Sequence, residues 1–186
     1  MSKRGGRLMP RCTLNVARTD SGYLIRVEGD GTAQESPTLA AFVHQYLQAD
    51  LQPSVVVDLS SCQYLDSTVL GCLLSLQRRC RDRSDSRFVV VADLQQRRRL
   101  LSTTRLDKVL ELVESAPETQ SQFVVLSPTR LRGTEFGRHV MESHLALAKL
   151  PCAHAPLFQE IADRLARELA GQRQVDEESE DVRETV

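Results

Sequence analysis

The chain has 186 residues, of which 41% are hydrophobic and 26% charged, and its formal net charge is −1. This ordinary globular composition fits one domain with an appendage or two small domains, and it gives no overall field toward nucleic acid or an anionic membrane. Aromatic residues make up only 4%, which leaves few stacking platforms for single-stranded bases, and no apolar run approaches the roughly 20 residues of a membrane span.

The cysteines are odd in number and scattered, and none forms a CxxC pair. This pattern argues against a zinc site and against a disulfide framework, so we expect reduced thiols in a cytoplasmic protein. The five are Cys12, Cys62, Cys72, Cys80 and Cys152.

The first elements predict a hairpin followed by a helix. Residues 1–11 are basic and lack the apolar segment of a secretory signal, so we expect a disordered lead. Residues 12–16 and 23–27 predict two strands joined by a turn. Ser36 and Pro37 are typical of a helix start, and apolar residues at helical spacing extend that helix to about residue 48.

The middle of the chain alternates strands and helices. Residues 55–59 form an apolar run without polar alternation, which predicts a central strand covered by helices on both faces. A second pair, Tyr64-Leu65, is expected to be buried, and Asp66-Ser67-Thr68 then opens a helix that we expect over residues 67–81.

A strand, a short basic helix and a last short strand are predicted next, over residues 88–92, 95–103 and 106–113. Single helices between strands imply right-handed parallel crossovers. The predicted fold class is therefore α/β, a mixed sheet with an N-terminal hairpin and parallel strands covered by helices.

The remainder predicts an appendage. Residues 115–132 read as a linker in which Phe123 to Leu126 can form an extra strand. Two amphipathic helices, over residues 134–150 and from 156 to a cap at Gly171, predict a helical hairpin spanning 133–172. The acidic residues 173–186 are expected to be a disordered tail.

Enzymatic motifs are missing from the sequence: there is no GxxxxGK[ST], GxGxxG, HExxH or GxSxG pattern. His139 and His144 are five residues apart, which does not place them on one helical face, so we favour ordinary surface or interface histidines over a metal site. The run Arg97 to Arg99 is interpreted as a solvated helix face rather than a nucleic-acid patch.

Ser67 allows two interpretations. Asp66 or Ser67 can be an N-cap that only satisfies backbone N–H groups. Alternatively, the Ser67 hydroxyl is displayed at a helix N-terminus, where a phosphate would change the charge of a binding surface. Local physics alone favours the cap.

The segment YLDSTVLGCLLSLQRRC resembles the central motif of STAS domains of the anti-sigma factor antagonist (anti-anti-sigma factor) type. The similarity covers residues 12–114 and includes the strand VVVDLS, the preceding hairpin and the later RRRLLSTTRLDKVLEL segment. We therefore expect a STAS domain over residues 12–114.

The resemblance implies a phosphorylation switch in the bacterial cytoplasm that regulates transcription. Ser67 would be phosphorylated by an anti-sigma factor with serine-kinase activity, which the unphosphorylated form binds, freeing a sigma factor; a PP2C-type phosphatase would reset the switch. No cofactor is expected, because ATP would sit on the partner. The resemblance places Asp66, Ser67, Thr68, Val69 and Gly71 in the partner-binding surface.

Val69 departs from the family, which has a glycine there, whereas Gly71 matches the second glycine of the motif. A valine adds bulk and stiffens the first turn of the helix, so docking is expected to differ if Val69 faces the partner.

Two other functions stay open. One is a STAS scaffold subunit of a stress-signalling or lipid-transport assembly, not regulated by phosphorylation. The other is an enzyme with Ser67 as nucleophile, which we disfavour because no histidine is predicted near Ser67 and a serine without a base is a poor nucleophile. The helical hairpin can form a homodimer, cover a sheet edge or hold a second partner. Neither nucleic acid nor membrane is expected as a partner.

Overall fold

The computed structural model describes residues 12–49, 54–83 and 86–184, with side chains as far as residue 172. The predicted disordered lead, residues 1–11, lies outside the described residues. Among the described helices, none is both long and apolar enough to cross a membrane.

The fold is mixed α/β, as predicted, and it is built on a seven-stranded sheet. Its path is β6-β5-β3-β2-β1-β7, and β4 pairs with the end of β2. The first two strands form the predicted antiparallel hairpin, and β3, β5 and β6 follow parallel to β2. The strands are β1 (Thr13–Thr19), β2 (Gly22–Gly31), β3 (Ser54–Asp58), β4 (Cys62–Leu65), β5 (Arg87–Val91), β6 (Leu112–Val113) and β7 (Val124–Val125).

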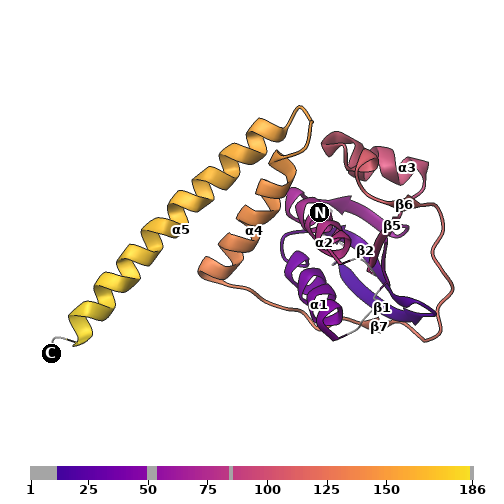
Figure 1. Cartoon of the computed structure of the whole chain (residues 1–186), viewed down its shortest axis with the longest axis horizontal. Helices are drawn as coiled ribbons and strands as arrows, with labels where there is room; N and C mark the ends of the chain where they lie inside the picture. The colour runs from indigo at the N-terminus through magenta and orange to yellow at the C-terminus, as the bar shows by residue number, and fades with distance from the viewer. Residues whose placement is uncertain (1–11, 50–53, 84–85, 185–186) are drawn as a thin grey trace, which may run out of the picture.

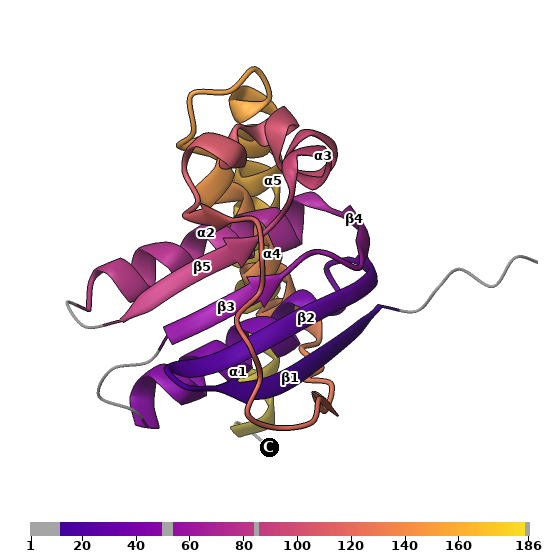
Figure 2. The same ribbon diagram turned by 90° about the vertical axis from the view of Figure 1, so that its right-hand side faces the viewer.

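Two helices cover one face of this sheet (Figure 1; Figure 2). They are α1 (Ser36–Ala49) and α2 (Ser67–Arg81), and α2 has the bounds that its sequence predicts. Their apolar stripes meet the inward side chains of the strands in one core, where Leu73 and Val57 are fully buried. Burial of this stripe, more than helix propensity, holds α2 in place.

The second face of the sheet is covered by an extended segment, so the expectation of helices on both faces is wrong. Residues 114–123 run across this face toward β7, which pairs with β1 (Figure 2). Phe123 packs on a small apolar cluster there, and its ring lies 4.2 Å from the guanidinium of Arg26. An apolar strand shows that both its faces are buried, but it does not show which element covers each face.

The segment after β5 is a series of short turns, in which the predicted strand over 106–113 is confirmed only at its end. It comprises α3 (Leu94–Gln96), a π-helical turn (Arg97–Leu101) and two 3₁₀ turns (Ser102–Thr104, Leu106–Lys108) before β6. The buried amide of Gln77 holds the chain there: it donates to the Val109 carbonyl at 2.9 Å and accepts from the Glu111 N–H at 2.7 Å. This long-range contact supplements the pairing of β6 with β5 and has no local sequence signal.

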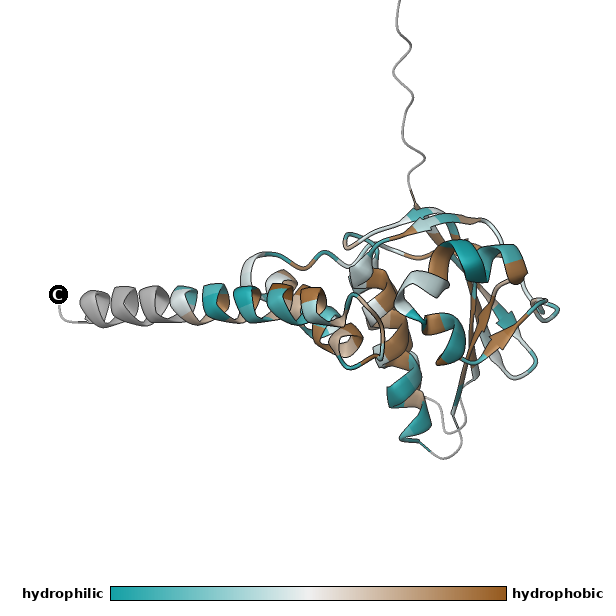
Figure 3. Cartoon of the chain, turned by 90° about the horizontal axis from the view of Figure 1, so that it is seen from above, coloured by the Kyte–Doolittle hydropathy of each residue, from teal (hydrophilic) through white to brown (hydrophobic). Residues whose placement is uncertain are grey.

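Helices α4 (Gly133–Ala148) and α5 (Ala155–Glu184) form the predicted hairpin, and α4 lies between α2 and α5 (Figure 1). The long C-terminal helix projects away from the rest of the fold (Figure 3). The expected helix end at Gly171 and the expected disordered tail are wrong, because α5 continues through Gly171 to Glu184. A glycine inside a helix costs only about 1 kcal/mol relative to alanine, and the glutamate, glutamine and arginine residues around it are good helix formers.

Candidate functional site

Asp66 is the N-cap of α2, and both of its carboxylate oxygens are occupied. Its backbone is extended (φ −81°, ψ 171°) and Oδ1 accepts from the Val69 N–H at 3.0 Å. Oδ2 accepts from the Ala33 N–H at 2.6 Å, which ties the start of α2 to the loop before α1. The capping role therefore belongs to Asp66, and the hydroxyl of Ser67 is left for another contact.

That contact is with a histidine from the C-terminal hairpin. The Ser67 Oγ lies 2.9 Å from Nε2 of His144, and Nδ1 of the same ring lies 2.8 Å from the Val140 carbonyl. Because a carbonyl only accepts, Nδ1 carries the proton, and in the neutral ring Nε2 accepts from the Ser67 hydroxyl. His144 is buried, with 4% of its surface exposed.

The prediction that no histidine lies near Ser67 is therefore wrong. A serine beside an oriented imidazole is the arrangement of an activated nucleophile, and in this pair Ser67 is partly exposed whereas His144 is buried. The sequence shows His144 on an apolar helix stripe with Leu147 and Leu150, but no local signal indicates which surface that stripe meets.

A second serine–histidine contact lies one helix away. Oγ of Ser36, the first residue of α1, is 2.7 Å from Nε2 of His139. His139 and His144 thus join α4 to the first residues of both sheet-covering helices. Each ring contacts a different helix, and among the described residues no group of three His, Cys, Asp or Glu side chains is placed to hold a metal ion.

At Gly71, α4 approaches α2 closely. A Cβ at this position would overlap with the main-chain carbonyl of Ser143 on α4. Ser143 is itself small and buried, and its hydroxyl donates to the His139 carbonyl at 2.9 Å. The glycine that the sequence assigns to a partner surface thus accommodates the chain's own helix.

Thr68 and Val69 are each only 3% exposed. Val69 belongs to the main core and lines a small gap with Leu14 and Leu39, so its departure from the family glycine fills the core in this conformation. Asp66 and Ser67 keep partial exposure. The assignment of these residues to a partner surface stays a prediction.

Burial makes the cysteine thiols poor nucleophiles. It raises the pKa of Cys72 to about 11 and that of Cys12 to about 12. The thiols of Cys62 and Cys80 have their pKa raised to about 11 by the same cause. All five cysteines are free, and these four thiols with raised pKa values do not contribute a thiolate near Ser67 at neutral pH.

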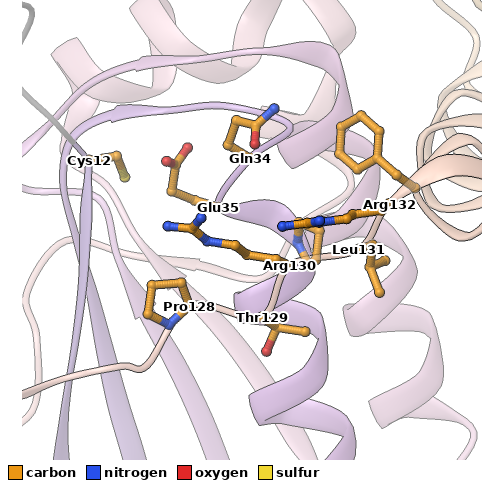
Figure 4. Close-up of a pocket in the computed structure, with 10 residues that line it drawn as sticks. Cys12, Gln34, Glu35, Pro128, Thr129, Arg130, Leu131 and Arg132 are labelled. Carbon is orange, nitrogen blue, oxygen red and sulfur yellow. The ribbon is translucent and has the colours of Figure 1, made fainter.

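A separate hollow of about 610 Å³ opens beside the first turn of α1 (Figure 4). The side chains of Glu35, Arg130 and Arg132 line it and supply charges of both signs. The linker that forms one wall is fastened to α1 by the Thr129 N–H, which donates to the Thr38 hydroxyl at 2.9 Å. This hollow lies on the path of the linker and does not include Ser67.

The sheet begins with a hairpin, and a serine follows the aspartate cap of a core helix. Together these two features define a class of small α/β domain. A family model described as "Mlab, STAS domain" matches residues 14–114, more than half of the chain, and the chain belongs to this family. Among solved structures, it is similar to an anti-sigma factor antagonist from Mycobacterium paratuberculosis at 24% identity and a TM-score of 0.45. That match covers 56% of this chain and 87% of the other.

Proposed function

We propose that this chain is a non-enzymatic binding protein of the anti-sigma factor antagonist type, controlled by phosphorylation of Ser67. In this proposal the unphosphorylated form sequesters an anti-sigma factor with serine-kinase activity and so frees a sigma factor. A PP2C-type phosphatase returns the phosphorylated form to the active state.

The observation that carries the proposal is the division of roles at the start of α2. Asp66 uses both carboxylate oxygens on backbone N–H groups, so capping does not require the Ser67 hydroxyl. Membership of the STAS family and the resemblance of Asp66-Ser67-Thr68 to the family's phosphorylated triplet support the same assignment.

The charge change explains how phosphate would act. A phosphate on Ser67 adds about −1.5 to −2 charge directly beside the Asp66 carboxylate. The first turn of α2 tolerates an anion, since its N–H groups point toward this end, so the modified helix stays folded. A partner that docks with an apolar or acidic contact would be repelled, and the switch would act on binding rather than on folding.

The test is a binding and phosphorylation assay with an ATP-binding anti-sigma factor kinase. We expect phosphate on Ser67 by mass spectrometry, Ser67→Ala to keep binding without accepting phosphate, and Ser67→Asp to lose at least tenfold in affinity. Tight binding by Ser67→Asp would overturn the proposal. Rapid labelling of Ser67 by an acylating probe, lost in His144→Ala, would favour an enzyme instead.

The second candidate function is a STAS scaffold subunit of a stress-signalling or lipid-transport assembly, independent of phosphorylation. The contact between Ser67 and His144 favours it, because here the hydroxyl is already used inside the chain. This candidate predicts that Ser67→Ala and Ser67→Asp both enter the same assembly as the unaltered chain. In that role, the long α5 is the expected contact with further subunits or with a second copy of the chain.

A further inference from the structure

The chain's own C-terminal hairpin covers the surface on which the proposed function depends. Helix α4 packs along α2, places His144 on the Ser67 hydroxyl and sets the Ser143 carbonyl against Gly71. A further anchor joins His139 to Ser36. The side of α4 that meets the domain is buried, as shown by Ser143, His144, Ala146 and Leu147.

This packing occupies the hydroxyl of Ser67, which keeps only partial exposure, and covers the surface at Gly71. The Ser67 oxygen is in hydrogen-bond contact with a ring that is itself buried, so a phosphoryl group on that oxygen would have to displace His144. Likewise, a partner that contacts Gly71 must take the place of the Ser143 main chain.

We propose that α4 is an intramolecular occupant of the partner-binding surface, so that the chain switches between a closed form and an open form. In the closed form His144 holds the hydroxyl of the partly exposed Ser67 and α4 covers Gly71, which limits access of kinase and partner, and only the open form binds. This inference rests on the proposed function for the identity of the partner, but the closure itself is tested without it. The site accepts a helix with a small residue opposite Gly71 and a hydrogen-bonding side chain opposite Ser67, and the partner element is expected to match that description.

The structure supports such a hinge. Helix α4 follows residues 126–132, which lack helix and strand. Leu126 and Thr129 bond to Leu14 and Thr38, so the hinge lies at residues 130–132, and the hairpin can leave from there as a unit without breaking the sheet. Helix α5 packs on the outer side of α4, with Gly137 against Leu169, and would travel with it.

Gly71→Ala is the first test in the full chain. Alanine is a better helix former than glycine, so α2 keeps its fold, while the added methyl group collides with α4. In a Ser67→Cys background we expect Gly71→Ala to speed thiol labelling at position 67 at least tenfold, with the site of labelling mapped by peptide mass. The matched control is Gly171→Ala on α5, where a Cβ meets nothing within 4 Å and no change is expected.

A second test places the substitution on α4, outside the STAS domain. Ser143→Arg puts an unpaired charge into the buried side of α4, and Glu142→Arg puts the same side chain on its exposed side. With the native Ser67, we expect Ser143→Arg to speed amide hydrogen exchange in residues 133–148 but not in β3, and Glu142→Arg to change neither.

The outcomes separate the two proposals. If neither Gly71→Ala nor Ser143→Arg alters labelling or exchange relative to its control, the closed form is not a switchable state and this inference fails, whatever the kinase assay gives. If both variants open the hairpin and Ser143→Arg also binds or accepts phosphate from the kinase at least tenfold better, the inference stands. If opening occurs but Ser67 still meets no kinase, the proposed function fails while the intramolecular closure is supported.

Discussion

Two helices of the chain begin with the same N-cap, an aspartate that follows a strand. Asp66 precedes α2 and Asp93 precedes α3, and both have extended backbones with ψ of 171° and 175°. Each carboxylate accepts from the N–H three residues on, at 3.0 Å for Asp66 and 2.7 Å for Asp93. The next residues differ: Ser67 lies under α4, whereas Leu94 is 59% exposed.

This difference shows that the same capping interaction can lie in two different tertiary surroundings. Local chemistry produces an aspartate cap in both places, and only tertiary packing distinguishes them. The cap at Asp66 also bonds the loop before α1, and the residue that follows it meets another helix. The cap at Asp93 closes on itself, because Gln96 returns a hydrogen bond to the Asp93 N–H at 2.7 Å.

The largest expected effect comes from removing the two caps. Asp66→Ala breaks bonds to Val69 and Ala33 and is expected to lower the free energy of unfolding by about 2–3 kcal/mol, since hydrogen bonds to charged groups are worth about 1.5–3 kcal/mol. Asp93→Ala breaks a local cap and is expected to cost about 1 kcal/mol. Urea denaturation measures the free energy of unfolding of both variants. Equal decreases would show that the additional hydrogen bond of Asp66 to Ala33 adds no stability beyond that of a local cap.

Removal of the ring over Ser67 should act mainly on the hairpin. His144→Ala leaves the Ser67 hydroxyl without its partner and a gap beneath α4, at a cost of about 1–3 kcal/mol in docking. Since about 1.4 kcal/mol is tenfold in an equilibrium constant, we expect exchange in residues 133–148 to rise at least several-fold. The control is His154→Ala, at an exposed position. Equal exchange in the two variants would show that the Ser67 contact does not hold the hairpin.

A smaller effect is expected from acid. Burial lowers the pKa of His139 below its usual value of 6.5, although Glu142 raises it in part. Because the docked ring binds a proton less readily than the free ring, its contribution to docking is complete above about pH 6.5 and declines as the pH falls from there toward the lowered pKa.

Burial also lowers the pKa of His44 on α1, with Arg79 and His139 acting in the same direction, so its effect on stability has the same sign. We expect the protection factors of the α4 amides, which correct for the intrinsic pH dependence of hydrogen exchange, to fall between pH 7.5 and pH 5.5. His139→Gln should weaken this dependence, because glutamine can still bond Ser36 but does not titrate in that range. An unchanged pH dependence in His139→Gln would assign the effect to other groups.

Much of the sheet and of α2 is predictable because their signals are local. Periodic apolar residues determine the hairpin, β3 and the bounds of α2, and Val124–Val125 forms the extra strand that the linker allowed. Tyr64 is an exception: it was expected to be buried with Leu65 but is 54% exposed. Tyr64 and Leu65 are consecutive residues of β4, so their side chains point to opposite sides of the strand, and only Leu65 faces the core.

Only the part of the candidate site that is contiguous in sequence can be predicted. The aspartate, the serine and the helix start are adjacent in sequence, whereas His144 reaches Ser67 across 77 residues. The five-residue spacing indicates that His139 and His144 point in different directions from α4. It gives no information that the first residues of α1 and α2 lie opposite them. That arrangement depends on docking of the hairpin, which the packing of Gly71 against Ser143 permits.

The smallest expected effect is at the uncovered helix start. Leu94→Ser removes an exposed side chain and is expected to change the free energy of unfolding by no more than about 0.5 kcal/mol. The reverse substitution, Ser67→Leu, places the same side chain beneath α4, where it must displace His144 and open the hairpin. Thermal denaturation and hydrogen exchange compare the two. If Ser67→Leu changed the free energy of unfolding and the hydrogen exchange as little as Leu94→Ser, the position after Asp66 would be as unconstrained as the position after Asp93. The packing of α4 over Ser67 would then contribute no measurable stability.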